Sequence, residues 1–389
     1  MRVHVIGVIQ YMQLRTYNQW TTVMAIFPKY HTAAPNTSAR PISMARALTL
    51  LCTSACMFSC AQEPVPNASE PVREIANIPA VLPHTDQANE GGWIYNAVVS
   101  DEFEGDTVDE DRWFIVGKFE DGKPVYKHPD KPNKWVWKGR APSQFSGRNY
   151  RLEDGKLVLE TRWEPDFPFE EEVRKPHFGE ALPYENITTA CFISRKFFTY
   201  GYIEIKSKAA DAEVTSAFWS MGDQIELDFF EQFGSHRMEG KAHLDRELWW
   251  SLRDWQRGLP EAGKPVYTEH KDLGFNVADE FHIYGFEWDE NGFKYYVDGE
   301  LISTVTPDDV RQWALENRDV PAGYDGWIAS RPISLWLDQE TFPWNGVPDS
   351  LEDLEMNSPV GEKEDGVVDF EIEYVRVWQK PQHILPEHK

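Results

Sequence analysis

The chain has 389 residues, of which 41% are hydrophobic, and it carries a formal net charge of −25 at pH 7. This length suffices for one large β domain or two ordinary domains. Because so acidic a chain is poorly suited to bind nucleic acid through a basic face, we expect no nucleic-acid partner.

Residues 1–61 are interpreted as an N-terminal extension followed by an export signal, which begins at a second methionine, Met44. Arg46 gives this signal a charged start, and an apolar run then leads to the small residues around Cys60. The run is too short to span a membrane. Cys60 could alternatively carry a lipid anchor of the bacterial lipoprotein type, although the residues before it match that pattern poorly. We expect a secreted protein or an outer-membrane-anchored lipoprotein of a bacterium.

Cysteine usage limits the covalent framework of the rest of the chain. Of the four cysteines, only Cys191 clearly lies outside the export segment, so we expect neither an intradomain disulfide nor a zinc site built from cysteine. Residues 62–90 are rich in Pro, Asn and Glu and predict a flexible linker. Residues 91–381 are expected to form the folded domain, and residues 382–389 a tail.

Short runs of alternating polar and apolar residues, separated by turn signals, occupy most of the predicted domain. A single short helix is predicted, over residues 307–317. Many strands with little helix predict an all-β fold, an antiparallel β-sandwich. The clearest runs cover residues 156–162, 201–207, 281–297 and 368–378.

Three acidic residues occur among large apolar residues in the middle of the chain. Apolar residues alternate with Glu226 and Asp228, which predicts a strand with both acids on one face. Glu231 lies an odd number of residues beyond Asp228, so a regular strand would turn it to the opposite face. A β-bulge at residues 229–230 would return Glu231 to the side of the other two acids.

The preceding run, residues 214–220, also alternates, and residues 221–224 predict a four-residue hairpin loop. This pairing would place Trp219 opposite Glu226, on the same face. An aromatic ring beside three carboxylates is a suitable arrangement for cleaving a sugar chain.

The run Glu226-Leu-Asp-Phe-Phe-Glu231 resembles the Glu-x-Asp-x-x-Glu signature of glycoside hydrolase family 16. Its six-residue, bulged form is similar to that of β-agarases, porphyranases and carrageenases, and it also occurs in laminarinases. Residues 98–113 resemble the opening of family 16 domains, and the matched segments extend to residue 378. The resemblance implies a jelly roll whose concave sheet forms a substrate cleft.

The resemblance implies that Glu226 is the nucleophile and Glu231 the acid/base of a retaining, double-displacement hydrolysis. Asp228, between them, is expected to hydrogen-bond Glu226 and to help keep one proton in the group by like-charge coupling. The alternative interpretation is an acidic sheet face exposed to solvent.

Five further residues are candidates for substrate binding. Trp219 is expected to stack on the sugar next to the cleaved bond, and Trp137 and Arg140 lie in a segment that resembles a cleft edge of agarases and porphyranases. His243 is expected on the strand after the acids, facing them, and Glu340 on a late cleft strand. For each of them a purely structural role, in the core or on a solvated surface, is the alternative.

The resemblance implies an endo-hydrolase that cleaves β-1,4 linkages in red-algal galactans, such as agarose, porphyran or furcellaran-type carrageenan. The alternatives are a β-1,3-glucanase of the same family and a non-catalytic carbohydrate-binding jelly roll. We expect a monomer that requires no cofactor. Family members often carry a structural calcium, for which oxygen ligands could come from around Asp101 and Glu102, but the spacing identifies no metal residues.

Overall fold

The computed structural model describes residues 10–16, 19–25, 81–128, 131–173, 181–235, 238–355 and 366–388. It divides into two units, Met1–Arg73 and Glu74–Lys389. In the first unit the described residues form one antiparallel hairpin, made of β1 (Gln10–Thr16) and β2 (Gln19–Ala25). The expected export signal, with Met44 and Cys60, and residues 62–80 of the expected linker lie outside the described residues.

The larger sheet of the second unit has ten strands among the described residues. Its order is β21-β20-β19-β14-β23-β11-β12-β9, with β10 beside β11 and β3 beside β23. All pairs are antiparallel except β12 with β9. The strands are β3 (Ile94–Tyr95), β9 (Gln144–Phe145), β10 (Tyr150–Glu153), β11 (Lys156–Trp163), β12 (Ile187–Thr189), β14 (Gly201–Lys208), β19 (His282–Asp289), β20 (Gly292–Val297), β21 (Glu300–Val305) and β23 (Val367–Gln379).

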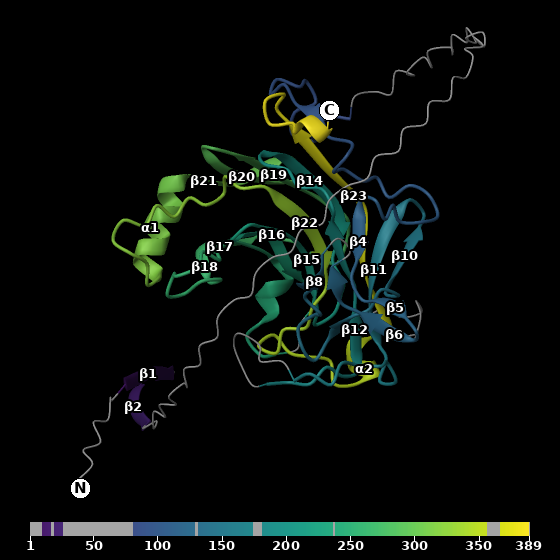
Figure 1. Cartoon of the computed structure of the whole chain (residues 1–389), viewed down its shortest axis with the longest axis vertical. Coiled ribbons are helices and arrows are strands. Elements are labelled where there is room, and N and C mark those ends of the chain that lie inside the picture. Colours follow the sequence, from purple (N-terminus) through teal and green to yellow (C-terminus); the bar gives the residue numbers. More distant parts are fainter. Residues whose placement is uncertain are drawn as a thin grey trace, which may run out of the picture. The chain divides into compact units, whose positions relative to one another are not determined.

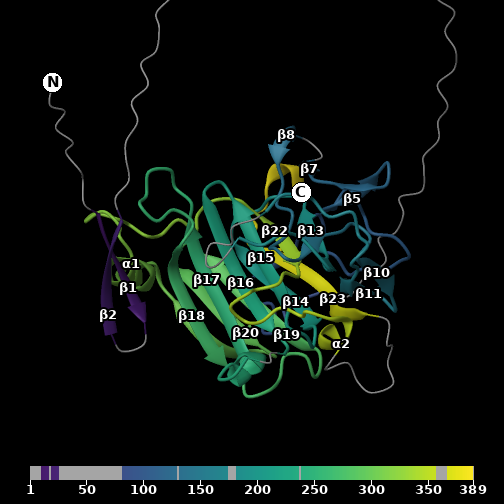
Figure 2. The same cartoon turned by 90° about the horizontal axis from the view of Figure 1, so that it is seen from below.

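The second sheet has seven antiparallel strands in the order β18-β17-β16-β15-β22-β13-β4. Figure 2 shows β18, β17, β16 and β15 of this sheet side by side. The strands are β4 (Trp113–Ile115), β13 (Cys191–Ser194), β15 (Thr215–Gly222), β16 (Ile225–Phe233), β17 (Glu247–Asp254), β18 (Pro265–Asp272) and β22 (Ile333–Asp338).

Little helix is present in the described residues, and none of it has the length and apolar character needed to cross a membrane. The helix predicted over residues 307–317 is confirmed as α1 (Pro307–Asn317), which starts with a capping box between Thr306 and Asp309. The other short elements are β5 (Lys118–Glu120), β6 (Lys123–Val125), β7 (Lys127–His128), β8 (Lys131–Trp135), η1 (Ala242–Arg246), α2 (Leu351–Leu354) and η2 (Pro386–His388).

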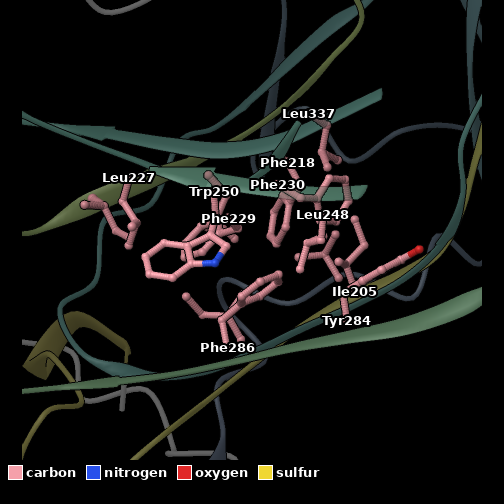
Figure 3. Close-up of a cluster of buried hydrophobic side chains, with 14 of the residues drawn as sticks. Ile205, Phe218, Leu227, Phe229, Phe230, Leu248, Trp250, Tyr284, Phe286 and Leu337 are labelled. Carbon is pink, nitrogen blue, oxygen red and sulfur yellow. The ribbon is translucent and has the colours of Figure 1, made fainter. Parts of the chain in front are cut away.

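The two sheets form curved layers that face each other (Figure 1), and an aromatic core fills the space between them (Figure 3). Ring centroids of Phe229 on the seven-stranded sheet and Phe286 on the ten-stranded sheet lie 5.1 Å apart. Those of Phe230 and Tyr284 lie 5.0 Å apart. Edge-on and tilted rings at these distances pack favourably beyond their burial alone. The predicted all-β sandwich is confirmed.

Parts of the expected linker and tail belong to this folded unit. The Trp378 indole nitrogen donates to the backbone oxygen of Val81 at 2.7 Å, and the His84 amide donates to the buried Glu204 at 2.8 Å. At the other end, the backbone oxygen of His383 accepts a hydrogen bond from Gln379. Residues from Val81 on, ahead of the expected start at residue 91, therefore contact the domain, because this segment supplies partners to buried polar groups.

Candidate active site

The predicted β-bulge on β16 is confirmed. Phe218 on β15 pairs with Phe230 and the next residue, Trp219, pairs with Asp228, so Phe229 has no partner on β15. Phe229 and Phe230 are both buried in the core. Because two consecutive rings enter the core face, Glu231 returns to the opposite face of the sheet, where all three acids line one cleft.

The hairpin that leads into β16 is shorter than predicted. β15 ends at Gly222 and β16 begins at Ile225, and Gln224 between them has a φ of 63°, the left-handed conformation that closes a tight turn. Glu226 consequently pairs with Met221, whereas Trp219 pairs with Asp228. The expected four-residue loop and the pairing of Trp219 with Glu226 were therefore wrong.

The cleft crosses the whole seven-stranded sheet and has a volume of about 1350 Å³. Its lining reaches from Phe114 on β4, at one edge of the sheet, to His270 on β18, at the other. Each strand buries alternate side chains between the sheets and directs the others into the cleft. A groove that runs across a sheet in this way can hold several consecutive sugars of a chain.

The side chains of Glu226 and Asp228 are held by N–H and O–H donors from β17 and the segment after it. Trp255 donates its indole N–H to Glu226 Oε2 at 2.7 Å. Arg253 Nε donates to Asp228 Oδ2 at 3.0 Å and lies 3.2 Å from Glu226 Oε1. The Ser251 hydroxyl donates to the same Asp228 oxygen. Arg253 thus bridges the two carboxylates, where we expected a direct hydrogen bond between them.

Burial, followed by the charge of Asp228, raises the pKa of Glu226 to about 8 and that of Glu231 to about 7. This order alone would leave the last proton of the group on Glu226. The hydrogen bond from Trp255 and the adjacent Arg253 guanidinium act against this order, because both stabilise the ionised form of Glu226. On this geometry we assign the proton to Glu231.

Trp219 lies in the cleft beside Trp336, with ring centroids 4.5 Å apart. Its indole N–H donates to Asp338 Oδ2 at 2.9 Å. Burial and the nearby charge of Glu340 raise the pKa of Asp338 well above its usual range. The structure places Trp219 on the cleft face as expected, but opposite Asp228 rather than Glu226, and adds Asp338 as the residue that fixes the orientation of the indole.

The structure brings together Trp137, Arg140 and Glu340, which lie far apart in the sequence. Glu340 accepts hydrogen bonds from the Trp137 indole and, at 3.1 Å, from Arg140 Nε. The Arg140 guanidinium lies 4.2 Å from the centroid of the Phe342 ring. All four residues line the cleft, so three of the predicted binding residues form a single cluster.

His243 is not on the strand after the acids, and this expectation was wrong. It lies in η1, the 3-10 helix that precedes β17, and its side chain is 50% exposed. The nearest carboxylate, that of Glu247, is 3.8 Å away. The histidine that lines this part of the cleft is His270 on β18, which stacks on Trp249 with ring centroids 3.9 Å apart.

Sequence analysis did not identify Ser251, Arg253 and Trp255, which contact the acids, or Asp338, which contacts Trp219. Ser251 and Arg253 alternate with apolar residues on β17, and this pattern could have indicated a second cleft-facing strand. Trp255 follows the end of β17, where no periodicity marks its direction. Asp338 alternates with Trp336 on β22.

Asp101 and Glu102, around which oxygen ligands for a calcium could have been found, have other partners in this structure. Asp101 accepts a hydrogen bond from the Trp113 indole and lies 3.7 Å from Arg112, and Glu102 accepts one from Arg376 at 2.7 Å. Within the described residues no group of three His, Cys, Asp or Glu side chains is arranged to hold a metal ion. This donor set does not suit calcium, which needs six to eight oxygen ligands.

Comparison with known proteins relates this architecture to sugar-cleaving enzymes. Residues 93–380 match the family model described as "Beta-porphyranase A-D, GH16 domain". The chain is 26% identical to beta-porphyranase B of Zobellia galactanivorans over 299 residues, 72% of this chain and 83% of that protein. It is 26% identical to a beta-agarase of Phocaeicola plebeius over 355 residues, 86% of this chain and 98% of that protein.

The fold agrees with these matches. The crystal structure of porphyranase B from Zobellia galactanivorans superposes with a TM-score of 0.51 at 24% identity and covers 74% of this chain and 92% of that chain. The structure of beta-agarase B from the same organism gives a TM-score of 0.51 at 20% identity and covers 74% of this chain and 93% of that chain. The chain therefore belongs to the beta-porphyranase A–D family of GH16 domains and is a glycoside hydrolase of the porphyranase/agarase type.

Proposed function

We propose that the protein is a retaining endo-hydrolase that cleaves internal β-1,4 linkages in red-algal galactans, such as agarose, porphyran or furcellaran-type carrageenan. The observation that carries this proposal is the bulge on β16, which gathers Glu226, Asp228 and Glu231 in one cleft. Retention requires two carboxyl groups roughly 5–5.5 Å apart. Relatives named as porphyranases and an agarase support the substrate class.

In this reaction Glu226 attacks the anomeric carbon while Glu231 transfers its proton to the oxygen of the leaving sugar. The covalent glycosyl-enzyme is then hydrolysed by water, which Glu231, now ionised, deprotonates. Asp228 keeps its charge through Ser251 and Arg253. After burial, the charge of Asp228 is the largest influence on the pKa of Glu231. This charge favours the protonated form of Glu231, which the first step needs.

The surroundings of the acids support binding of a long neutral or sulfated chain. Trp219 and Trp336 offer aromatic surface next to the catalytic strand, and sugar rings stack on such faces. The cluster of Trp137, Arg140 and Glu340 supplies polar groups at one side of the cleft. Because the cleft reaches both edges of the sheet, internal bonds can enter it, which supports endo cleavage.

The proposal is tested by incubating the protein with agarose, porphyran, κ-carrageenan, furcellaran and laminarin and sizing the products. We expect a galactan to yield a ladder of oligosaccharides whose first products, observed by NMR, retain the β-anomer. Glu226→Ser should abolish turnover and leave oligosaccharide binding in place, whereas the exposed Glu300→Ser on β21 should behave as wild type. Inverted products, or turnover by Glu226→Ser, would refute the mechanism.

A β-1,3-glucanase remains the second candidate, because a glucan endo-1,3-beta-glucosidase A1 of Niallia circulans is 27% identical over 258 residues, 64% of this chain and 34% of that protein. Preferential cleavage of laminarin would establish it. A non-catalytic carbohydrate-binding module, the third alternative, is set aside by membership of a glycoside hydrolase family.

We also propose that the protein is exported and acts as a monomer without a cofactor. The charged start at Arg46 and the apolar run after it support export. Mass spectrometry of the mature N-terminus distinguishes a cleaved signal from a lipid-modified Cys60. Light scattering tests the oligomeric state, and activity after dialysis against a chelator tests the cofactor.

A further inference from the structure

Arg253 occupies a fixed position against two of the three carboxylates on β16. In the ladder between β16 and β17, Arg253 lies directly opposite Glu226, and Ser251 lies opposite Asp228. Because side chains two residues apart on a strand share a face, both β17 residues project into the cleft. The pairing of the two strands therefore delivers one guanidinium to this site.

We propose that Arg253 is a positioning residue that keeps Glu226 and Asp228 ionised together, so that the proton retained by the three acids resides on Glu231. This proposal rests on the retaining reaction proposed above. Arg253 Nε is 3.2 Å from Glu226 Oε1 and 3.0 Å from Asp228 Oδ2, and one nitrogen thus serves both carboxylates. The backbone oxygen of Gly263 accepts from Nη1 at 3.5 Å and anchors the other end of the guanidinium.

The chemistry of these groups makes the arrangement selective for the ionised form of Glu226. A guanidinium has only donors and does not lose its charge in proteins. Trp255 directs a second donor at the other oxygen of Glu226. A protonated Glu226 would set its own O–H against the Trp255 N–H or against the guanidinium, whereas an ionised Glu226 accepts from Trp255 and is stabilised by the charge of Arg253.

The remaining charges near the cleft floor do not replace Arg253. Arg140 is bonded to Glu340, and Lys264 at the cleft edge is paired with Glu261 at 2.7 Å. Burial keeps the pKa of Asp338 well above its usual range, so this group adds little negative charge. Among the described residues, further titratable groups lie near the three acids. They are Arg253 on β17, Asp338 and Glu340 on and after β22, Arg140 before β9, His270 on β18 in the same cleft, and Tyr295 on β20, which interacts with Asp228.

Loss of this charge has a distinctive consequence for the pH profile. The charge of Arg253 lowers the pKa of both Glu226 and Glu231 against the effect of burial. Without it both carboxyl groups hold their protons to higher pH, by about one to three units for an opposite charge at this distance. The proton also moves toward Glu226, so that the nucleophile is neutral at the pH where the wild type works.

The experiment compares Arg253→Met, Arg253→Lys and Arg257→Met on the galactan that the wild type cleaves, with kcat measured against pH. Arg257 is exposed, lies four residues away and does not line the cleft, and its removal changes the net charge equally. We expect kcat of Arg253→Met to fall at least about tenfold at the pH optimum of the wild type. The acidic and alkaline limbs of its kcat–pH profile should both move to higher pH, by about one pH unit or more. Arg253→Lys should keep the limbs near their wild-type positions, and Arg257→Met should match the wild type.

The proposal would be overturned if Arg253→Met lost activity while both limbs of its kcat–pH profile stayed at their wild-type positions. A rise in KM alone would overturn it as well. A titration without substrate separates this failure from failure of the proposed function. Carboxyl ¹³C signals of glutamate-labelled protein, with Glu226 assigned by Glu226→Gln, should titrate at higher pH in Arg253→Met. If the wild type cleaves none of the galactans, the proposed function fails. The titration still decides whether Arg253 keeps Glu226 ionised.

Discussion

Glu231 differs from Glu226 in the partners of its carboxyl group. Burial and the charge of Asp228 raise the pKa of both carboxyl groups, and Glu226 in addition accepts a hydrogen bond from Trp255 and lies against Arg253. The residue types at these two positions are identical, so the division of roles comes from neighbours contributed by another strand. Two carboxyl groups with different surroundings are a recurrent basis for acid and nucleophile roles.

The raised pKa of Glu231 makes stability depend on pH. The unfolded chain releases this proton near pH 4.5, whereas the folded protein holds it up to about pH 7. Between these values the folded state binds more protons, so the free energy of unfolding falls as pH rises. Glu231→Gln has no carboxyl group to ionise at this position, so its free energy of unfolding does not fall in this way. At pH 8 it should be more stable than the wild type by on the order of 1–3 kcal/mol.

Denaturant unfolding of both proteins at pH 5 and pH 8 measures this effect. Near pH 5 the two should differ little, because Glu231 is protonated in the folded wild type. Glu300→Gln, on an exposed site, serves as the control: because it keeps Glu231, its stability should fall with pH as that of the wild type does. An advantage of Glu231→Gln that is equal at both pH values would contradict the prediction.

At the scale of elements, the bulge on β16 decides the direction of Glu231. Deletion of Phe229 would restore a regular ladder and would keep Glu231 on the cleft face, because Glu231 would then lie two residues beyond Asp228. We expect the variant to retain measurable activity, since the acid/base stays in the site, and unfolding to become easier by about 3 kcal/mol or more from the lost ring. Phe229→Leu keeps the extra residue and should also retain most activity; complete loss of activity in the folded deletion variant would contradict this account of the bulge.

The segment after β17 holds Trp255 in place through Gly263. Gly263 has a φ of +86°, and a Cβ atom there would lie 2.4 Å from a ring atom of Trp255. Gly263→Ala should displace the indole from Glu226 and lower kcat by about tenfold, the loss of roughly one hydrogen bond to a charged group. Gly258→Ala is a matched control, because Gly258 also has a positive φ, +95°, but its Cβ would contact nothing within 4 Å. A similar loss of kcat in both variants would show that backbone strain, not the Trp255 contact, is responsible.

At the scale of the whole domain, residues 81–90 supply hydrogen-bond partners to side chains of the ten-stranded sheet. Val81 accepts a hydrogen bond from Trp378, and His84 donates one to Glu204, whose pKa is raised by burial. A chain that starts at residue 91 leaves these buried groups without those partners, at a cost of about 1–3 kcal/mol each. Thermal unfolding should therefore occur at a lower temperature for residues 91–389 than for residues 81–389. Equal midpoints would contradict this extension of the domain.

Local patterns in the sequence determined the class of fold and the position of the three acids. Alternation predicts a strand wherever one face is buried, and the odd spacing of Asp228 and Glu231 requires a bulge if both are to share a face. The helix at residues 307–317 followed from its proline and its length. These features depend on neighbours within a few residues, which the sequence contains.

The tertiary structure alone decided which side chains surround the acids. Arg253 and Trp255 reach Glu226 from more than twenty residues away, and the pairing of β16 with β17 sets which of them meet. A shift of one residue in that pairing would turn the partners to the other face. The length of the hairpin before β16 and the turn that contains His243 were decided in the same way, because packing of the entire sheet fixes where each strand begins.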